Sequence, residues 1–135
     1  MQIKAMRVYY LVWAAVLFVT EILIGSVFSG LVWLRSYGGD ILVIPLIYCI
    51  IRIVTDRLPR LMPVLVCCIG FAAEFLQWIH LSERLGFEPG SLGAILIGTS
   101  FSWYDMLCYL AGMVLIYLGV LARISLVNRK KGVKQ

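Results

Sequence analysis

The chain has 135 residues, of which 62% are hydrophobic and only 14% are charged. Soluble domains are typically about 45–50% apolar and about 25% charged. One soluble fold of this length could not bury so much apolar surface, whereas lipid can act as its solvent. The composition therefore predicts a small integral membrane protein with a single all-α domain.

The same composition disfavours two other classes of function. The formal net charge is +5, but the basic residues stand at the ends of apolar runs, so we expect membrane-surface contacts and no nucleic-acid binding. The four cysteines lie inside apolar runs and form no CxxC pair. We therefore expect them to pack as small hydrophobic residues rather than to hold a metal or a disulfide.

Four apolar segments are expected to cross the membrane, because each carries few charges and a spanning helix needs about 20 residues. In chain order they are residues 8–28, 39–55, 61–81 and 104–123. The second is the shortest, so we expect it either to extend from about residues 38–40 to Thr55 or to be tilted into thinner membrane. Together they predict an integral membrane four-helix bundle over residues 1–128. A basic tail at 129–135 follows, which we expect to be disordered near anionic lipid.

The connection between the third and fourth segments, residues 82–103, is long. Within it the stretch Ser91–Gly98 is apolar and rich in glycine. Backbone at membrane depth must be covered by protein, because lipid offers it no hydrogen bonds. We therefore expect this stretch to form either a short re-entrant helix in the outer leaflet or a lid.

Lysine and arginine are unevenly distributed between the two ends of these segments. If the N-terminus is cytoplasmic, Arg35 and Arg84 are the only two of the twelve that lie outside. The positive-inside rule favours this arrangement. We therefore predict a multi-pass protein of the bacterial cytoplasmic (inner) membrane with N-in/C-in topology.

Each predicted helix carries one acidic residue toward the outer face. Glu21 and Glu74 both lie thirteen residues from the inner start of their segments, which is about 20 Å at ~1.5 Å per residue. Asp40 and Asp105 begin the second and fourth segments at the outer face. A charge in hydrocarbon costs several kcal/mol, so such residues usually face a partner or a cavity. We predict that these four acids meet in a polar pocket that opens to the outside.

The third segment adds polar neighbours to Glu74. At about 100° per residue, Gln77 and Arg84 would share a face of one continuous helix with Glu74, and His80 would border that face. Arg35, just before the second segment, is the other outer cation. We include Gln77, Arg84 and Arg35 among the candidate ligand-binding residues, and we expect His80 to be an interfacial residue.

A structural interpretation of the same acids also stays open. Glu21 and Glu74 could be protonated, or could pair with Arg35 or Arg84, and thereby hold helices together. Asp40 could simply N-cap the second helix after two glycines. Ser102 and Asp105 have the spacing of a capping box at the start of the fourth helix.

Three short motifs occur in a fixed order along the chain. They are Gly39-Asp40, then Glu74-x-x-Gln77, then Gly98-Thr99-Ser100-Phe101-Ser102-Trp103-Tyr104-Asp105 leading to Tyr109-x-x-Gly112. The set resembles the uncharacterised bacterial membrane proteins grouped as domain of unknown function 2809, over roughly residues 21–112. The resemblance implies the fold and the position of the site, but no biochemical activity.

A more distant similarity is to VanZ-like proteins, which are linked with glycopeptide antibiotic resistance. Glu74, Gln77, Asp105 and Gly112 match the pattern of that family. Tyr109 stands where that family has asparagine, and the arginine that it carries before the aspartate is missing here. These departures argue against a role in resistance.

The candidate residues predict a binding protein of the cell envelope. Its pocket would hold an envelope lipid headgroup or a cell-wall precursor. The ligand would donate hydrogen bonds to Glu74, Asp105 and Asp40, or its phosphate would share a divalent cation with them. Oxygen ligands of this kind suit Mg²⁺ or Ca²⁺. Gln77 would orient the ligand, and either outer arginine would supply the counter-charge.

Three alternatives stay open. The first is a membrane enzyme that modifies a phospholipid or polyprenyl substrate through paired carboxyl groups, although no serine or cysteine nucleophile stands beside a base in a recognisable pattern. The second is a subunit of an ion- or proton-coupled transporter. The third is a structural subunit of a homo-oligomer or of a complex with a protein partner, in which the acids serve only assembly.

Overall fold

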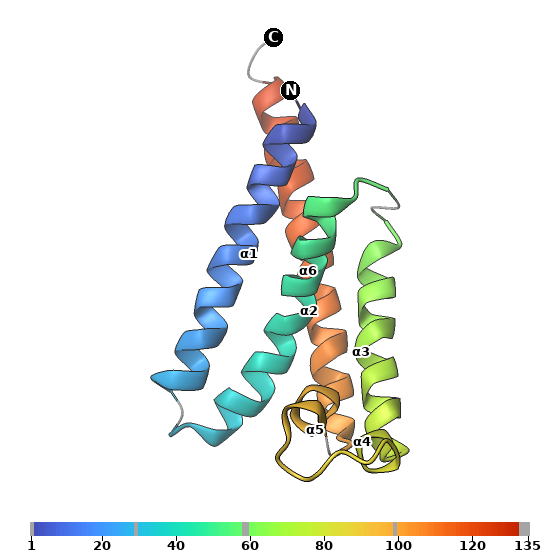
Figure 1. Cartoon of the computed structure of the whole chain (residues 1–135). Coiled ribbons are helices and arrows are strands. Elements are labelled where there is room, and N and C mark those ends of the chain that lie inside the picture. Colours follow the sequence, from blue (N-terminus) through green and yellow to red (C-terminus); the bar gives the residue numbers. More distant parts are fainter. Residues whose placement is uncertain (1, 29, 58–59, 99, 133–135) are drawn as a thin grey trace.

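The structure is a computed structural model that describes residues 2–28, 30–57, 60–98 and 100–132, and all regular secondary structure in this part is helical. The elements are α1 (Gln2–Ser26), η1 (Leu34–Gly38), α2 (Gly39–Val54), α3 (Met62–Trp78), α4 (Leu81–Arg84), α5 (Leu92–Ile97) and α6 (Trp103–Gly132). In Figure 1 the long helices form one bundle, with α1 against α2 and with α6 between α2 and α3. The short α4 and α5 lie together at one end of it.

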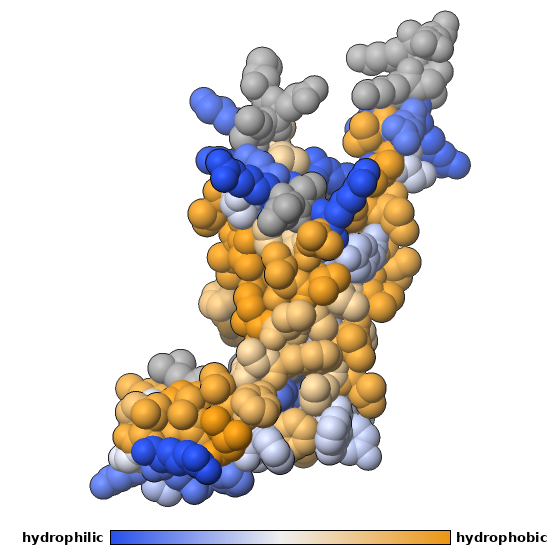
Figure 2. Space-filling view, turned by 90° about the vertical axis from the view of Figure 1, so that its right-hand side faces the viewer, coloured by the Kyte–Doolittle hydropathy of each residue, from blue (hydrophilic) through white to orange (hydrophobic). Residues whose placement is uncertain are grey.

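Three helical stretches are long and apolar enough to cross a membrane. They are Lys4–Ser26, Leu34–Val54 and Trp103–Lys130. Most of the large apolar side chains on their outer faces are exposed, and Figure 2 shows a broad hydrophobic band between hydrophilic residues at the two ends. A soluble protein rarely exposes an apolar surface of this extent. The prediction of an all-α membrane protein is therefore confirmed, and the fourth span and the orientation stay predictions.

The second span begins earlier than the sequence predicted. Residues Leu34–Gly38 form a π-helical turn, η1, that continues directly into α2. Gly38 and Gly39 both have right-handed helical dihedrals, with φ of −63° and −60°. The combined stretch is 21 residues long. The interpretation of Asp40 as an N-cap is therefore wrong, because Asp40 lies inside a continuous helical run and caps nothing.

The third segment ends earlier than predicted. α3 has 17 residues and ends at Trp78, because His80 adopts a left-handed backbone conformation with φ of 54°. A non-glycine residue in this region interrupts a right-handed helix. The chain then turns into the separate α4. The prediction that Arg84 continues the polar face of Glu74 on one helix is therefore wrong.

The connection between α3 and α6 contains a short helix in the stretch where the sequence suggested either a re-entrant helix or a lid. α5 lies inside the predicted Ser91–Gly98 stretch, and the Ala94 backbone N–H donates to Ser91 Oγ at 3.3 Å, as an N-cap does. Leu92 is exposed, whereas Ala94 is buried. The depth of this helix in a membrane stays a prediction.

One end of the bundle gathers the basic residues. The start of α1, the end of α6 and the connection after α2 all lie there (Figure 1). Arg7 forms an ion pair with Asp56 across this end, with an N–O distance of 3.7 Å. α6 runs through residues 129–132, so this part of the predicted disordered tail is helical, and residues 133–135 lie outside the described residues. Basic residues in the last turns of a helix complement its dipole.

Candidate functional site

Glu74 is the centre of the candidate site. Its side chain is 1% exposed. Oε1 accepts a hydrogen bond from the Tyr109 hydroxyl at 3.0 Å, and Oε2 accepts one from the Ser102 backbone N–H at 3.1 Å. Such bonds offset the cost of burying a carboxylate. The suggested pairing of Glu74 with an outer arginine is wrong, since the described residues contain no such ion pair and both oxygens bind groups near the start of α6.

Gly70 makes room for the ring of Tyr109. It lies one turn before Glu74 on α3, so the two residues face the same neighbour. A Cβ atom at Gly70 would lie 2.9 Å from Tyr109 Cδ2 and 3.2 Å from Ile44 Cδ1. The glycine therefore lets the ring pack against the backbone of α3, with its hydroxyl directed at Glu74.

Tyr109 was missing from the site residues that the sequence predicted. The available signal was its position four residues after Asp105, which puts both side chains on one face of α6. An aromatic residue at this spacing fits a packed core equally well. The hydrogen bond to Glu74 shows that the phenol belongs to the site.

The carboxyl groups of Asp40 and Asp105 lie close to each other. Glu74 and Glu21 are close enough to act on Asp40 electrostatically. The Asp105 backbone N–H donates to Ser102 Oγ at 3.4 Å, so Ser102 caps α6 as the sequence suggested. The structure thus brings the four predicted acids into one region.

Gly112 determines how closely α2 and α6 approach near these acids. A Cβ atom there would lie 2.6 Å from the backbone oxygen of Ile41 and 3.0 Å from Cβ of Ile44. Small residues at such crossings let membrane helices come into backbone contact. This contact brings Asp40 of α2 and Asp105 of α6 within reach of each other.

A cavity of about 410 Å³ lies beside the acids. Its polar lining comes from Glu21, Arg35, Asp40 and Tyr109. Glu21 Oε1 is buried and has no hydrogen-bond partner among the described residues. A buried acceptor without a partner is costly, so this oxygen is available to a donor that a ligand would bring.

Four of the predicted ligand-binding residues do not line this cavity: Glu74, Asp105, Gln77 and Arg84. The side chain of Gln77 packs against Gly98, where an added Cβ would meet the side-chain amide. Gly98 has a φ of 84°, which favours glycine. Gln77 thus supports the connection before α6. Arg84 lies exposed on α4, and His80 is exposed at the end of α3.

The predicted metal ligands do not form a metal site. Throughout residues 2–28, 30–57, 60–98 and 100–132, no group of three or more His, Cys, Asp or Glu side chains is arranged to hold a metal ion. The combination of Glu74, Asp40 and Asp105 is therefore not a metal centre in this structure.

A second cavity of about 410 Å³ is aromatic and lies between α3 and the start of α6. It is lined by Phe71, Phe75, Trp78, Phe101, Trp103 and Met106. Aromatic residues near helix ends commonly form an interfacial belt. Residue spacing in the sequence gave no sign that aromatic side chains of α3 and of the start of α6 would line one cavity together.

Comparisons with other proteins identify a family. Searches of curated proteins and of solved structures found no match. The family model described as "Protein of unknown function (DUF2809)" matches residues 30–113. This range includes Asp40, Glu74, Asp105 and Tyr109, but not Glu21. The chain belongs to the DUF2809 family.

Proposed function

We propose that this protein binds the headgroup of an envelope lipid or of a lipid-linked cell-wall precursor in its acidic cavity. The observation that carries the proposal is the unpartnered, buried Glu21 Oε1 in a cavity that Asp40, Arg35 and Tyr109 also line. Polar groups at this position in a membrane bundle are costly unless something pairs with them. A polar ligand would supply the missing partner.

The charges at the site favour a particular headgroup. Acids from α1, α2, α3 and α6 gather near the cavity, whereas Arg35 is the basic residue among those that line it. A purely anionic headgroup would meet repulsion from these acids. We therefore propose a zwitterionic headgroup, with an ammonium group near Glu21 and Asp40 and a phosphate near Arg35.

The aromatic cavity supports a lipid rather than a soluble ligand. Its lining includes Trp103 and Met106 of α6, and Tyr109 of the same helix lines the acidic cavity. Binding sites commonly combine an apolar lining with a few polar groups that fix orientation. The hydrocarbon chain would occupy the aromatic cavity while the headgroup occupies the acidic one.

We propose that α3 is a fourth span and that both ends of the chain are cytoplasmic. α3 is ~26 Å long at ~1.5 Å per residue, and a small mismatch with a ~30 Å hydrocarbon core costs little. The basic residues at the end that holds both chain termini support this orientation. The bacterial cytoplasmic membrane is the corresponding location.

Cysteine labelling tests the number of spans and the orientation together. In a background without the native cysteines, E88C should react with a membrane-impermeant maleimide in intact spheroplasts, and R57C should react only after lysis. Both positions are exposed and flank α3 in the chain. The reversed pattern would refute the orientation. Labelling of both from the same side would show that α3 does not span.

Lipid analysis of the purified protein tests the binding proposal. Native mass spectrometry and lipidomics should find a retained amine-bearing lipid, and Glu21→Gln or Asp40→Asn should reduce it about tenfold or more, since a charge-assisted hydrogen bond is worth ~1.5–3 kcal/mol. Glu88→Gln is the matched control, because Glu88 is an exposed acid outside both cavities. A protein that retains no lipid, or variants that retain as much, would contradict the proposal.

One observation favours a second candidate function. Asp40 and Asp105 lie close together, and paired carboxyl groups suit acid–base chemistry in a membrane enzyme acting on a phospholipid or polyprenyl substrate. In the same lipid analysis, such an enzyme would produce a chemically altered lipid. The altered lipid should then be missing from preparations of the Asp105→Asn variant.

A further inference from the structure

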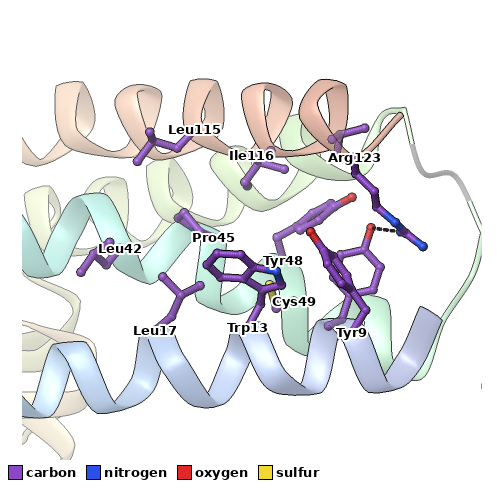
Figure 3. Close-up of a pocket in the computed structure, with 13 residues that line it drawn as sticks. Tyr9, Trp13, Leu17, Leu42, Pro45, Tyr48, Cys49, Leu115, Ile116 and Arg123 are labelled. Atoms are coloured by element: carbon purple, nitrogen blue, oxygen red, sulfur yellow. Dashed lines mark hydrogen bonds between the residues drawn. The ribbon is translucent and has the colours of Figure 1, made fainter. Parts of the chain in front are cut away.

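A third cavity, distinct from the acidic and the aromatic ones, extends from the basic end of the bundle toward its middle. It has a volume of about 250 Å³ and lies between α1, α2 and α6 (Figure 3). Its walls are apolar and aromatic side chains, with Arg123 at one end. We call it the basic-end groove, and its lining includes Trp13, Leu17, Pro45, Ile116, Gly119 and Arg123.

Two guanidinium groups gather at the polar end of this groove. Arg123 donates a hydrogen bond to the Tyr10 hydroxyl at 3.3 Å, and its guanidinium carbon lies 4.8 Å from the ring centroid of Tyr9. Arg52 lies 5.3 Å from the ring centroid of Tyr10. The tyrosines thus hold two cations close together.

No carboxylate neutralises these two cations in the described part of the chain. The ion pair that the structure contains there joins Arg7 to Asp56 instead. Arg52 lies next to the groove lining and is only 4% exposed. Its two terminal nitrogens donate to the Thr55 backbone oxygen at 3.4 Å and to Met6 Sδ at 3.6 Å, and its Nε has no hydrogen-bond partner. Buried charges are normally paired, so this end of the groove is complementary to an anion.

The depth of Arg123 matches the level of lipid phosphates. Arg123 lies twenty residues after Trp103 on α6, which is about 30 Å and equals the thickness of the hydrocarbon core. The groove extends along α6 from Arg123 back to Leu115, or ~12 Å toward the membrane centre. Its volume is below the ~300–1,000 Å³ of typical small-molecule pockets, which suits a single chain.

Gly119 leaves the groove open on the side of α6. A Cβ atom at this glycine would meet no heavy atom within 4 Å. Trp13, on the opposite wall, is 47% exposed, so the groove is accessible from the surrounding lipid. Bulk added at Gly119 would enter the groove without displacing protein atoms.

We propose that the basic-end groove binds an anionic phospholipid, with one acyl chain along Gly119 and the phosphate on Arg123. The unpaired cations select the charge of the lipid, and the apolar walls hold its chain. Basic residues near the surface attract anionic lipid in the same way. This site is separate from the acidic cavity and does not depend on the function proposed for it.

Fluorescence quenching of Trp13 tests this proposal. A variant with Trp13 as its single tryptophan would be placed in phosphatidylcholine vesicles that contain brominated phosphatidylglycerol or brominated phosphatidylcholine. The phosphatidylglycerol should quench at several-fold lower mole fraction. Arg123→Gln should abolish this preference, and Arg123→Lys should keep most of it because the charge remains.

Filling the groove tests where the chain lies. Gly119→Leu should reduce quenching by brominated phosphatidylglycerol at least twofold. Ala122→Leu, which places the same side chain at an exposed position of α6 outside the groove, should not. Equal quenching by both lipids in the unsubstituted groove would overturn the proposal. An unchanged preference in Arg123→Gln would also overturn it. Protection of Trp13 from both lipids would overturn it as well, because it would indicate that a protein segment covers the groove.

Discussion

Gly112→Leu is expected to destabilise the fold by ~3 kcal/mol or more. A Cβ atom at Gly112 would lie 2.6 Å from the backbone oxygen of Ile41, and a backbone atom cannot rotate away as a side chain can. Overpacking a core usually costs ~1–3 kcal/mol, and here α2 and α6 would have to separate. Unfolding by sodium dodecyl sulfate, followed by circular dichroism, would measure the loss.

Gly119→Leu is the matched control for this prediction. Both glycines lie on the same side of α6, seven residues apart, but no atom lies within 4 Å of a Cβ at Gly119. Leucine has a better helix propensity than glycine by up to ~1 kcal/mol, so this variant should be as stable as the parent or slightly more stable. Equal destabilisation by both substitutions would show that the contact between α2 and α6 is not the cause.

Composition and residue spacing were enough to predict the membrane helices and the gathering of the four acids. Apolar runs predicted membrane helices, and the cost of charge in lipid predicted that Glu21, Asp40, Glu74 and Asp105 would gather. The structure does bring these acids together near one end of the bundle. This part was predictable because the energies involved are large and depend on residue type more than on local backbone detail.

Local backbone conformation explains what the sequence prediction missed. Arg84 could share a face with Glu74 only on a continuous third helix, and the left-handed His80 breaks that helix before Arg84. Asp40 was interpreted as a cap because two glycines precede it, but both glycines continue the helix. Small differences in backbone energy decide such positions, and tertiary packing can outweigh them.

The role of Tyr109 depended on packing between helices. Its hydroxyl reaches Glu74 because Gly70 on α3 leaves space for the ring. That space depends on the register of α3 against α6. The spacing of residues within either helix carries no information about this register. The glycine and the tyrosine were both visible in the sequence, but their relation was not.

The hydrogen bond between Glu74 and Tyr109 should be among the strongest polar interactions in the bundle. Glu74→Ala would leave the phenol and the Ser102 N–H without an acceptor, so we expect a loss of ~3 kcal/mol or more. Tyr109→Phe removes one donor from the buried carboxylate and should cost ~1–3 kcal/mol. The two substitutions share one contact, so their effects should not add.

A double-mutant cycle measures this coupling directly. The loss of stability in the double variant should be ~1.5–3 kcal/mol smaller than the sum of the losses in the two single variants. This difference is the usual range for a hydrogen bond to a charged group. Tyr117→Phe is the control, since the Tyr117 hydroxyl donates to the exposed backbone oxygen of Arg60 at 3.0 Å. Its loss should cost at most ~1 kcal/mol, because water can replace it. A cycle with no coupling, or an equal cost at Tyr117, would mean that the buried carboxylate does not depend on Tyr109, and the candidate site would lose its structural centre.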